Sequence, residues 1–231
     1  MALISLPFNY NGSKAISGII YKNVILADNP AAFWQLNETS GTIAHDISGN
    51  NLNGTIETGV TIGQTEGIPN SPGSFLFNGS NGYVDVPASS LLCPLSEGSV
   101  EAWVNWQGST TVSGDWLSTG GNIGYRTRYA DGNADIVYAQ ADQLHSTTAL
   151  GSGFTHVVIT FGPSGSQIYQ NGVFINSGGA AYSQSAGTQA VHLGACLTYS
   201  EYFNGYLSNI AVYNDILTAT QIQNHYNAGI A

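Results

Sequence analysis

Thr155-His-Val-Val-Ile-Thr-Phe161 carries apolar side chains on both faces of an extended chain, which is typical of a strand buried from two sides. A short polar stretch follows, and the chain continues with Ile168-Tyr-Gln-Asn-Gly172. Asn-Gly permits the positive φ angles of a tight hairpin turn, so a second strand and a turn are expected here. This part of the sequence therefore predicts consecutive antiparallel strands.

The same succession of strand-like run and turn recurs along most of the chain. Asn-Gly pairs also occur at 53–54, 78–79, 81–82 and 204–205. Extended runs are expected at 82–86, 98–106, 156–161, 167–171, 190–194 and 204–213. One short helix is expected near the C-terminus, where Thr218 and Gln221 have the spacing of a capping box. Many short strands without crossover helices predict an all-β fold, an antiparallel β-sandwich of the jelly-roll kind with a short C-terminal helix.

Composition and charge limit the partners. The chain has 231 residues with 8% charged residues, against about 25% in a typical soluble domain. Four Lys and Arg face fourteen Asp and Glu, which gives a formal net charge of -10. Binding to phosphates needs clustered cations, and the close pair here is Arg126 and Arg128, so nucleic acid and anionic membranes are poor partners. The acidity suits calcium ions and neutral or cationic glycans, or it only limits self-association.

The N-terminal segment differs from the rest of the chain. Residues 1–24 are apolar and turn-rich, and they form a predicted docking arm in front of a single domain at 25–231. The segment lacks the basic start and continuous apolar run of a secretory signal, and no stretch of the sequence approaches membrane-spanning length. For Cys93 and Cys196, two buried free thiols are favoured over one long-range bridge.

Several separated motifs follow one another in a distinctive order. They include Val24-Ile-Leu-Ala-Asp-Asn-Pro-Ala-Ala-Phe-Trp-Gln-Leu36, Phe77-Asn-Gly-Ser-Asn-Gly-Tyr-Val-Asp-Val-Pro87, Ser99-Val-Glu-Ala-Trp-Val104 and Phe203-Asn-Gly-Tyr-Leu-Ser-Asn-Ile-Ala-Val-Tyr213. Together with the runs at 155–161 and 168–172, they resemble the bacterial and phage laminin G-like domains of the concanavalin A-like lectin/glucanase superfamily. The resemblance covers most of the chain and leaves out the arm. It departs from the family at Phe154, where Trp is frequent, and at Asn209 or Gln170, where an acid is frequent.

Oxygen-rich side chains around a sharp turn form a candidate calcium site. Asp46 and Asn50 lie in such a turn, and hard cations bind carboxylate and carbonyl oxygens. Asn209 and backbone carbonyls would complete the site. The alternative is that Asp46 and Asn50 bond to their own backbone and hold the turn. The missing acid at Asn209 weakens the calcium interpretation.

No motif predicts catalysis. Glu97 and Glu101 fall four residues apart on one face of a predicted strand, a placement in which two acids could flank a glycosidic bond. However, the jelly-roll hydrolases of the resembling superfamily typically carry Glu-x-Asp-x-x-Glu, which is absent here. We therefore expect a scaffold role for Glu101 and no enzymatic activity.

Aromatic and polar residues in predicted loops are candidates for glycan contact. Sugars stack their CH faces on aromatic rings, while Asn and Asp bond the hydroxyls. The candidate residues are Trp116, Tyr125, Tyr129, Asp131, Asn133, Tyr199 and Tyr202. For Trp34 and Trp103, core packing is favoured over ligand contact.

These observations favour a non-enzymatic recognition or display module with lectin-like glycan-binding capacity. The first hypothesis is a phage virion surface protein, a capsid decoration or receptor-binding component, whose arm 1–24 docks onto other virion or surface proteins. The alternative is a carbohydrate-binding module of a bacterial surface or secreted protein. A glycoside hydrolase is disfavoured, and a homo-oligomer is compatible with either hypothesis.

Overall fold

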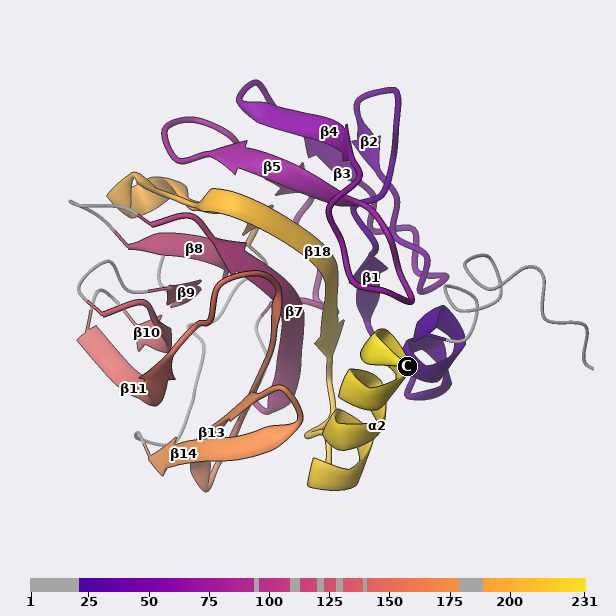
Figure 1. The fold of residues 1–231 in the computed structure, drawn as a ribbon. Coiled ribbons are helices and arrows are strands. Elements are labelled where there is room, and N and C mark those ends of the chain that lie inside the picture. The colour runs from indigo at the N-terminus through magenta and orange to yellow at the C-terminus, as the bar shows by residue number, and fades with distance from the viewer. Residues whose placement is uncertain are drawn as a thin grey trace, which may run out of the picture.

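The computed structural model describes residues 21–93, 96–108, 113–119, 123–127, 131–138, 141–178 and 189–231. Within this part of the chain, two eight-stranded antiparallel sheets pack face to face (Figure 1). The arrangement confirms the predicted antiparallel β-sandwich of the jelly-roll kind. None of the described helices is long and apolar enough to cross a membrane.

Sheet A is the sheet that the helices cover. Its path runs through β14 (Val173–Gly178), β13 (Gly165–Gln170), β12 (Thr155–Gly162), β7 (Gly98–Trp106), β18 (Asn204–Tyr213), β5 (Ser74–Asn78) and β4 (Val60–Gln64). The short strand β1 (Ala32–Trp34) also pairs with β18. The observed bounds of β7 and β18 are those predicted from the sequence.

Sheet B forms the other layer. It contains β11 (Ala141–Ala149), β10 (Asn133–Tyr138), β9 (Ile123–Thr127), β8 (Gly114–Thr119), β15 (Val191–Leu193), β6 (Val84–Val86), β3 (Gly54–Ile56) and β2 (Ile43–Ala44). A separate hairpin, Ala195–Tyr202, pairs β16 (Ala195–Cys196) with β17 (Glu201–Tyr202) around the 3-10 helix η1 (Leu197–Tyr199).

The main core lies between the sheets and follows the period of two along each strand. On β7, Val100, Ala102 and Val104 point into this core. Glu101 and Trp103 therefore point to the opposite, outer face of sheet A. The predicted free cysteines, Cys93 and Cys196, are both buried and unbridged.

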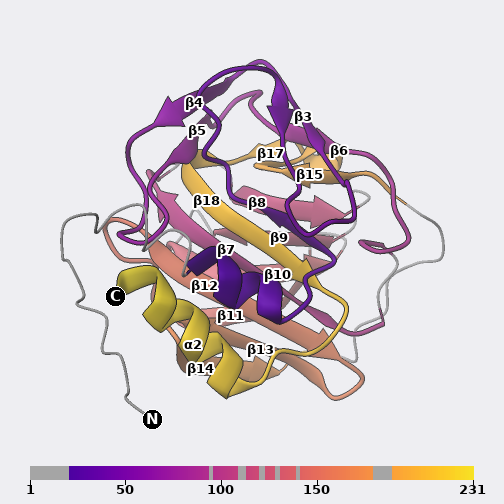
Figure 2. The same ribbon diagram turned by 90° about the vertical axis from the view of Figure 1, so that its right-hand side faces the viewer.

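Two helices cover that outer face (Figure 2). The C-terminal helix α2 (Ala219–Ile230) begins at Thr218, and the capping box with Gln221 is present as predicted. A second helical segment at 21–27 lies beside α2. Together they bury a second apolar cluster against sheet A.

The helical segment 21–27 corrects the predicted boundary of the arm. Tyr21 and Ile25 are fully buried in the second cluster, and the Tyr21 hydroxyl accepts a hydrogen bond from Trp103 Nε1 at 2.9 Å. Residues 21–24 therefore belong to the domain rather than to the arm. Residues 1–20 lie outside the described part of the chain, so the docking role stays a prediction.

Candidate functional site

A pocket of about 360 Å³ opens on the outer face of sheet A, which is within the range of roughly 300–1,000 Å³ for small-molecule sites. Four separate segments line it: the loop 66–69 between β4 and β5, Trp103 and Asn105 of β7, Gly153 and Phe154 before β12, and Ile230 at the end of α2. The pocket thus depends on the packing of α2 against the sheet.

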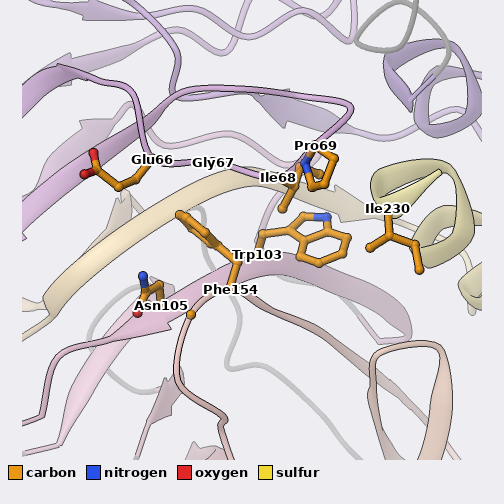
Figure 3. Close-up of a pocket in the computed structure, with 9 residues that line it drawn as sticks. Glu66, Gly67, Ile68, Pro69, Trp103, Asn105, Phe154 and Ile230 are labelled. Atoms are coloured by element: carbon orange, nitrogen blue, oxygen red, sulfur yellow. The ribbon is translucent and has the colours of Figure 1, made fainter. Parts of the chain in front are cut away.

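The two ends of the pocket differ in chemistry. Glu66 and Asn105 lie at one end, and Pro69 and Ile230 lie at the other (Figure 3). The Asn105 Oδ1 atom accepts a hydrogen bond from Gln107 Nε2 at 2.8 Å. That bond leaves the Asn105 amide group as a donor at the end of the pocket that Glu66 also lines.

Aromatic side chains form the middle of the pocket (Figure 3). Phe154 is half-buried, and its ring lies 6.5 Å from the ring of Tyr206. Phe154 is the position at which the laminin G-like domains that the sequence resembles often have Trp. An aromatic face flanked by an amide donor and a carboxylate acceptor matches the alternating apolar and hydroxyl surfaces of a sugar.

The Trp103 side chain is held rigidly below the pocket. Its ring stacks on Tyr226 with centroids 5.9 Å apart and lies 4.9 Å from the ring of His156. A Cβ atom at Gly229 would approach Trp103 Cζ2 to 2.5 Å, so only glycine allows α2 this close. Trp103 is 2% exposed, so core packing is its main role, as predicted.

A buried polar network beside Trp103 joins the helices to sheet A. The Glu101 carboxylate accepts a hydrogen bond from the Tyr213 hydroxyl at 2.9 Å and lies 2.8 Å from His225 Nδ1. His225 Nε2 lies 2.8 Å from Asp28 Oδ2, which follows the helical segment 21–27. His156 Nε2 lies 3.3 Å from Glu101.

The protonation of this network follows from its geometry. Burial would lower the pKa of His225, but pairing with Glu101 and Asp28 raises it to about 9. Burial would likewise raise the pKa of Glu101, but the His225 charge and the His156 hydrogen bond lower it below its ordinary value. His225 is therefore an imidazolium at neutral pH, and Glu101 has the scaffold role expected for it.

The predicted glycan residues do not gather at the pocket. Trp116 and Tyr125 are 0% and 1% exposed, and their rings lie 5.8 Å apart in the main core. This burial corrects their assignment, because neither ring presents a face to solvent. The two predicted loop positions turn out to lie on β8 and β9, whose inward faces fill the sandwich.

The other glycan candidates lie near sheet B. Asp131 is exposed, and its Oδ1 accepts the backbone N–H of Asn133 at 3.0 Å, which holds the turn before β10. Tyr199 and Tyr202 are half-buried on the hairpin Ala195–Tyr202. Tyr129 lies outside the described residues. A ligand role for these positions stays a prediction.

The calcium candidates make contacts typical of a structural turn. Both Asp46 oxygens are occupied: Oδ1 accepts the N–H groups of Phe33 and Ser48, and Oδ2 accepts the Leu52 N–H and the Ser48 hydroxyl, all at 2.9 Å. Asn50 Nδ2 donates to the Ala31 carbonyl at 3.0 Å. The four donors on Asp46 favour the turn-holding alternative.

Asn209 has a different role from the predicted ligand. It has a φ of 52° at a β-bulge of β18, and Asn tolerates this left-handed conformation. Its Oδ1 accepts from the Ser71 hydroxyl at 2.9 Å, and its Nδ2 donates to the Ser208 hydroxyl at 2.6 Å. With these contacts, Asp46, Asn50 and Asn209 do not fit the predicted calcium site; calcium binding by the chain stays a prediction.

A second buried polar cluster lies on sheet B. Arg126 Nε binds Asp135 at 3.1 Å, and Arg126 Nη1 binds Glu201 of the hairpin at 3.1 Å. Asp115 is fully buried beside them. Burial raises its pKa well above the ordinary value, Glu201 raises it further, and Arg126 opposes the change. Asp115, with its raised pKa, therefore lies in the same cluster in which Glu201 is paired with Arg126.

Sequence reasoning missed most of the pocket. Asn105 and Glu66 carry no local motif, and Ile230 comes from a helix far away in sequence. The one available signal was Phe154, an aromatic residue in a glycine-rich loop and a departure from the resembling family.

The sandwich and its pocket define a lectin-type β-sandwich protein. Residues 78–223 match the laminin G family described as "Concanavalin A-like lectin/glucanases superfamily". The chain belongs to this family. No curated protein sequence gives a significant match to the chain.

Solved structures share the fold at low sequence identity. Domain 4 of AbnA, an extracellular GH43 arabinanase from Geobacillus stearothermophilus solved with arabinotriose, is 20% identical with a TM-score of 0.70; the match covers 86% of this chain and 98% of that domain. The receptor-binding domain of botulinum neurotoxin mosaic serotype C/D is 16% identical with a TM-score of 0.66, over 87% of this chain and 51% of that chain.

Trypanosoma rangeli sialidase also shares the fold. It is 14% identical with a TM-score of 0.63, and the match covers 84% of this chain. This chain spans only 32% of the sialidase. The likeness therefore concerns the fold of one part of a larger enzyme.

Proposed function

We propose that this protein is a non-enzymatic carbohydrate-binding module and that the aromatic pocket beside α2 is its binding site. The observation that carries the proposal is that Phe154, Glu66 and Asn105 line the same pocket (Figure 3). The fold supports it, since the AbnA domain with arabinotriose bound matches over nearly its whole length.

The burial of Glu101 supports a binding rather than a hydrolytic role. Glycoside hydrolysis needs two carboxyl groups that reach the scissile bond. Glu101 is fully buried beneath the helices and paired with His225, whereas Glu97 is exposed. These two acids therefore cannot act together on a glycan.

A glycan array followed by titration calorimetry tests the proposal. We expect the protein to bind neutral oligosaccharides, and Phe154→Ala to weaken the binding about tenfold through the lost stacking surface. Phe174→Ala is the matched control, because Phe174 is 49% exposed on β14 and lies outside the pocket. Equal weakening by both variants, or no glycan binding at all, would refute the proposal. Release of reducing ends from a bound glycan would refute the non-enzymatic part.

We further propose, as the narrower role, display on a virion surface, with the arm docking onto another virion protein. Because Tyr21 is buried in the domain, the truncation that tests the docking role of the arm ends at residue 20. Removal of residues 1–20 should abolish assembly onto the particle and leave the domain folded, since the Tyr21 contact with Trp103 is retained. Unchanged assembly would contradict display through the arm and leave a free carbohydrate-binding module.

A further inference from the structure

The ligand of the pocket is restricted first by charge. Glu66 is the charged group among the lining residues, and none of the described lining residues is cationic. Of the described cations, Arg126 is engaged by Asp135 and Glu201 on sheet B, and Lys22 does not line the pocket. A carboxylate sugar would bring a second negative charge into this pocket without a cationic partner among its lining residues, so the pocket disfavours acidic sugars.

The ligand is restricted next by the two ends of the pocket. Glu66 supplies an acceptor and Asn105 a donor at one end, so this end of the pocket can form hydrogen bonds with sugar hydroxyl groups. Ile68, Pro69 and Ile230 form the other end with apolar side chains (Figure 3). A hydroxyl held against that wall would lose its hydrogen bonds to water without replacement.

A pyranose ring can contact the polar end and the apolar end of the pocket at the same time. Its C2 and C3 hydroxyls lie on the ring edge opposite C5. When they bond to Glu66 and Asn105 and the ring stacks on Phe154, the C5 substituent meets the apolar wall. In an ordinary hexose this substituent is a hydroxymethyl group, in a uronate a carboxylate, and in a 6-deoxyhexose a methyl group. Only the methyl group matches the wall.

We propose that the pocket selects neutral 6-deoxyhexose units and places their methyl group against Ile230. This inference rests on the carbohydrate-binding function proposed above and names its ligand class. The wall around Ile230 disfavours both the C6 hydroxyl of a hexose and the C6 carboxylate of a uronate, and the negative charge of Glu66 in the same pocket adds to the rejection of the uronate.

Matched methyl glycosides test the selection by NMR titration. The pairs are methyl α-L-rhamnopyranoside with methyl α-L-mannopyranoside, and methyl α-L-fucopyranoside with methyl α-L-galactopyranoside; each pair differs only in the C6 hydroxyl. In at least one pair we expect the 6-deoxy member to bind about tenfold more tightly, and the methyl glycoside of galacturonic acid not to bind. If 6-hydroxy sugars bind as tightly, the selection is refuted while carbohydrate binding stands. If no sugar binds, both fail.

Two variants assign the selection to its residues. Ile230→Ser should bring the affinities within each pair to near equality, whereas Glu66→Gln, which leaves the wall intact, should keep the preference for the 6-deoxy member. Ile216→Ser is the control, because Ile216 is 46% exposed and Ile230 is 45% exposed, but Ile216 lies outside the pocket. Thermal unfolding verifies that each variant folds. A preference unchanged in Ile230→Ser would overturn the role of the wall.

Discussion

The two outer faces of the sandwich bury charge in opposite ways. On sheet A, the Glu101 carboxylate is balanced by the His225 imidazolium, and the pair fixes α2 over the strands. On sheet B, Asp115, Asp135 and Glu201 surround the single described guanidinium of Arg126, and burial and Glu201 raise the pKa of Asp115. The balanced pair joins sheet A to α2, the helix whose Ile230 lines the pocket, whereas the cluster on sheet B lies away from the pocket.

The largest expected effect comes from breaking the balanced pair. Glu101→Ala leaves the His225 charge buried beside one remaining carboxylate, and removal of one partner of a buried pair costs about 3–5 kcal/mol. Denaturant unfolding measures the loss. Glu97→Ala, an exposed position just before the same strand, should stay within about 0.5 kcal/mol of the wild type. Similar losses in both variants would contradict a special role for the pair.

The next largest effect is the pH dependence of the unfolding free energy that arises from the same Glu101–His225 pair. His225 gains its raised pKa on folding, so its contribution to stability is complete below 6.5 and is lost as the pH rises through about 9. The groups that face it are Glu101, Asp28 and Tyr213. The expected loss is on the order of 2–3 kcal/mol. Unfolding free energies measured from pH 6 to 10 should decline in the wild type and decline less in His225→Gln. Parallel curves would exclude His225 as the source.

Neutralisation of Asp115 in the cluster on sheet B should stabilise the protein at neutral pH, in contrast to the loss of stability expected for Glu101→Ala on sheet A. Asp115→Asn keeps the shape of the protonated carboxyl, so stability at about pH 3.5, below the ordinary pKa of Asp, should change by less than about 1 kcal/mol. The raised pKa of Asp115 means that its favourable contribution is present at low pH and is lost as the pH rises. Asp115→Asn should therefore gain stability relative to the wild type as the pH rises from about 3.5 to neutral pH. Asp135→Asn, which weakens the Arg126 pair, should lose stability at both pH values.

The comparison also explains what the sequence could predict. Strand alternation and Asn-Gly turns depend on neighbours in sequence, so the strands β7 and β18 and the sandwich itself were predictable. The capping box at Thr218 is similarly local. Whether Trp116 and Tyr125 are buried depends on which face of β8 and β9 points into the core. The sequence suggested that both residues lie in exposed hairpins, and this prediction is wrong.

Long-range contacts account for what the sequence did not reveal. Glu101 and His225 are far apart along the chain, and neither has a local pattern that names the other as its partner. The helical segment 21–27 was missed because it is only about two turns long, although Tyr21, Val24 and Ile25 on its buried face have helical spacing. The pocket combines four such segments, so its position could emerge only from the folded structure.

The location of the bound glycan tests the account most directly. In an NMR titration with the neutral glycan that gives the strongest array signal, the largest chemical-shift changes should occur at Asn105, Phe154 and Ile230 around the pocket. Signals of the hairpin Ala195–Tyr202 on sheet B should stay unchanged. Changes concentrated in that hairpin, with the pocket signals unmoved, would contradict the assignment of carbohydrate binding to the outer face of sheet A.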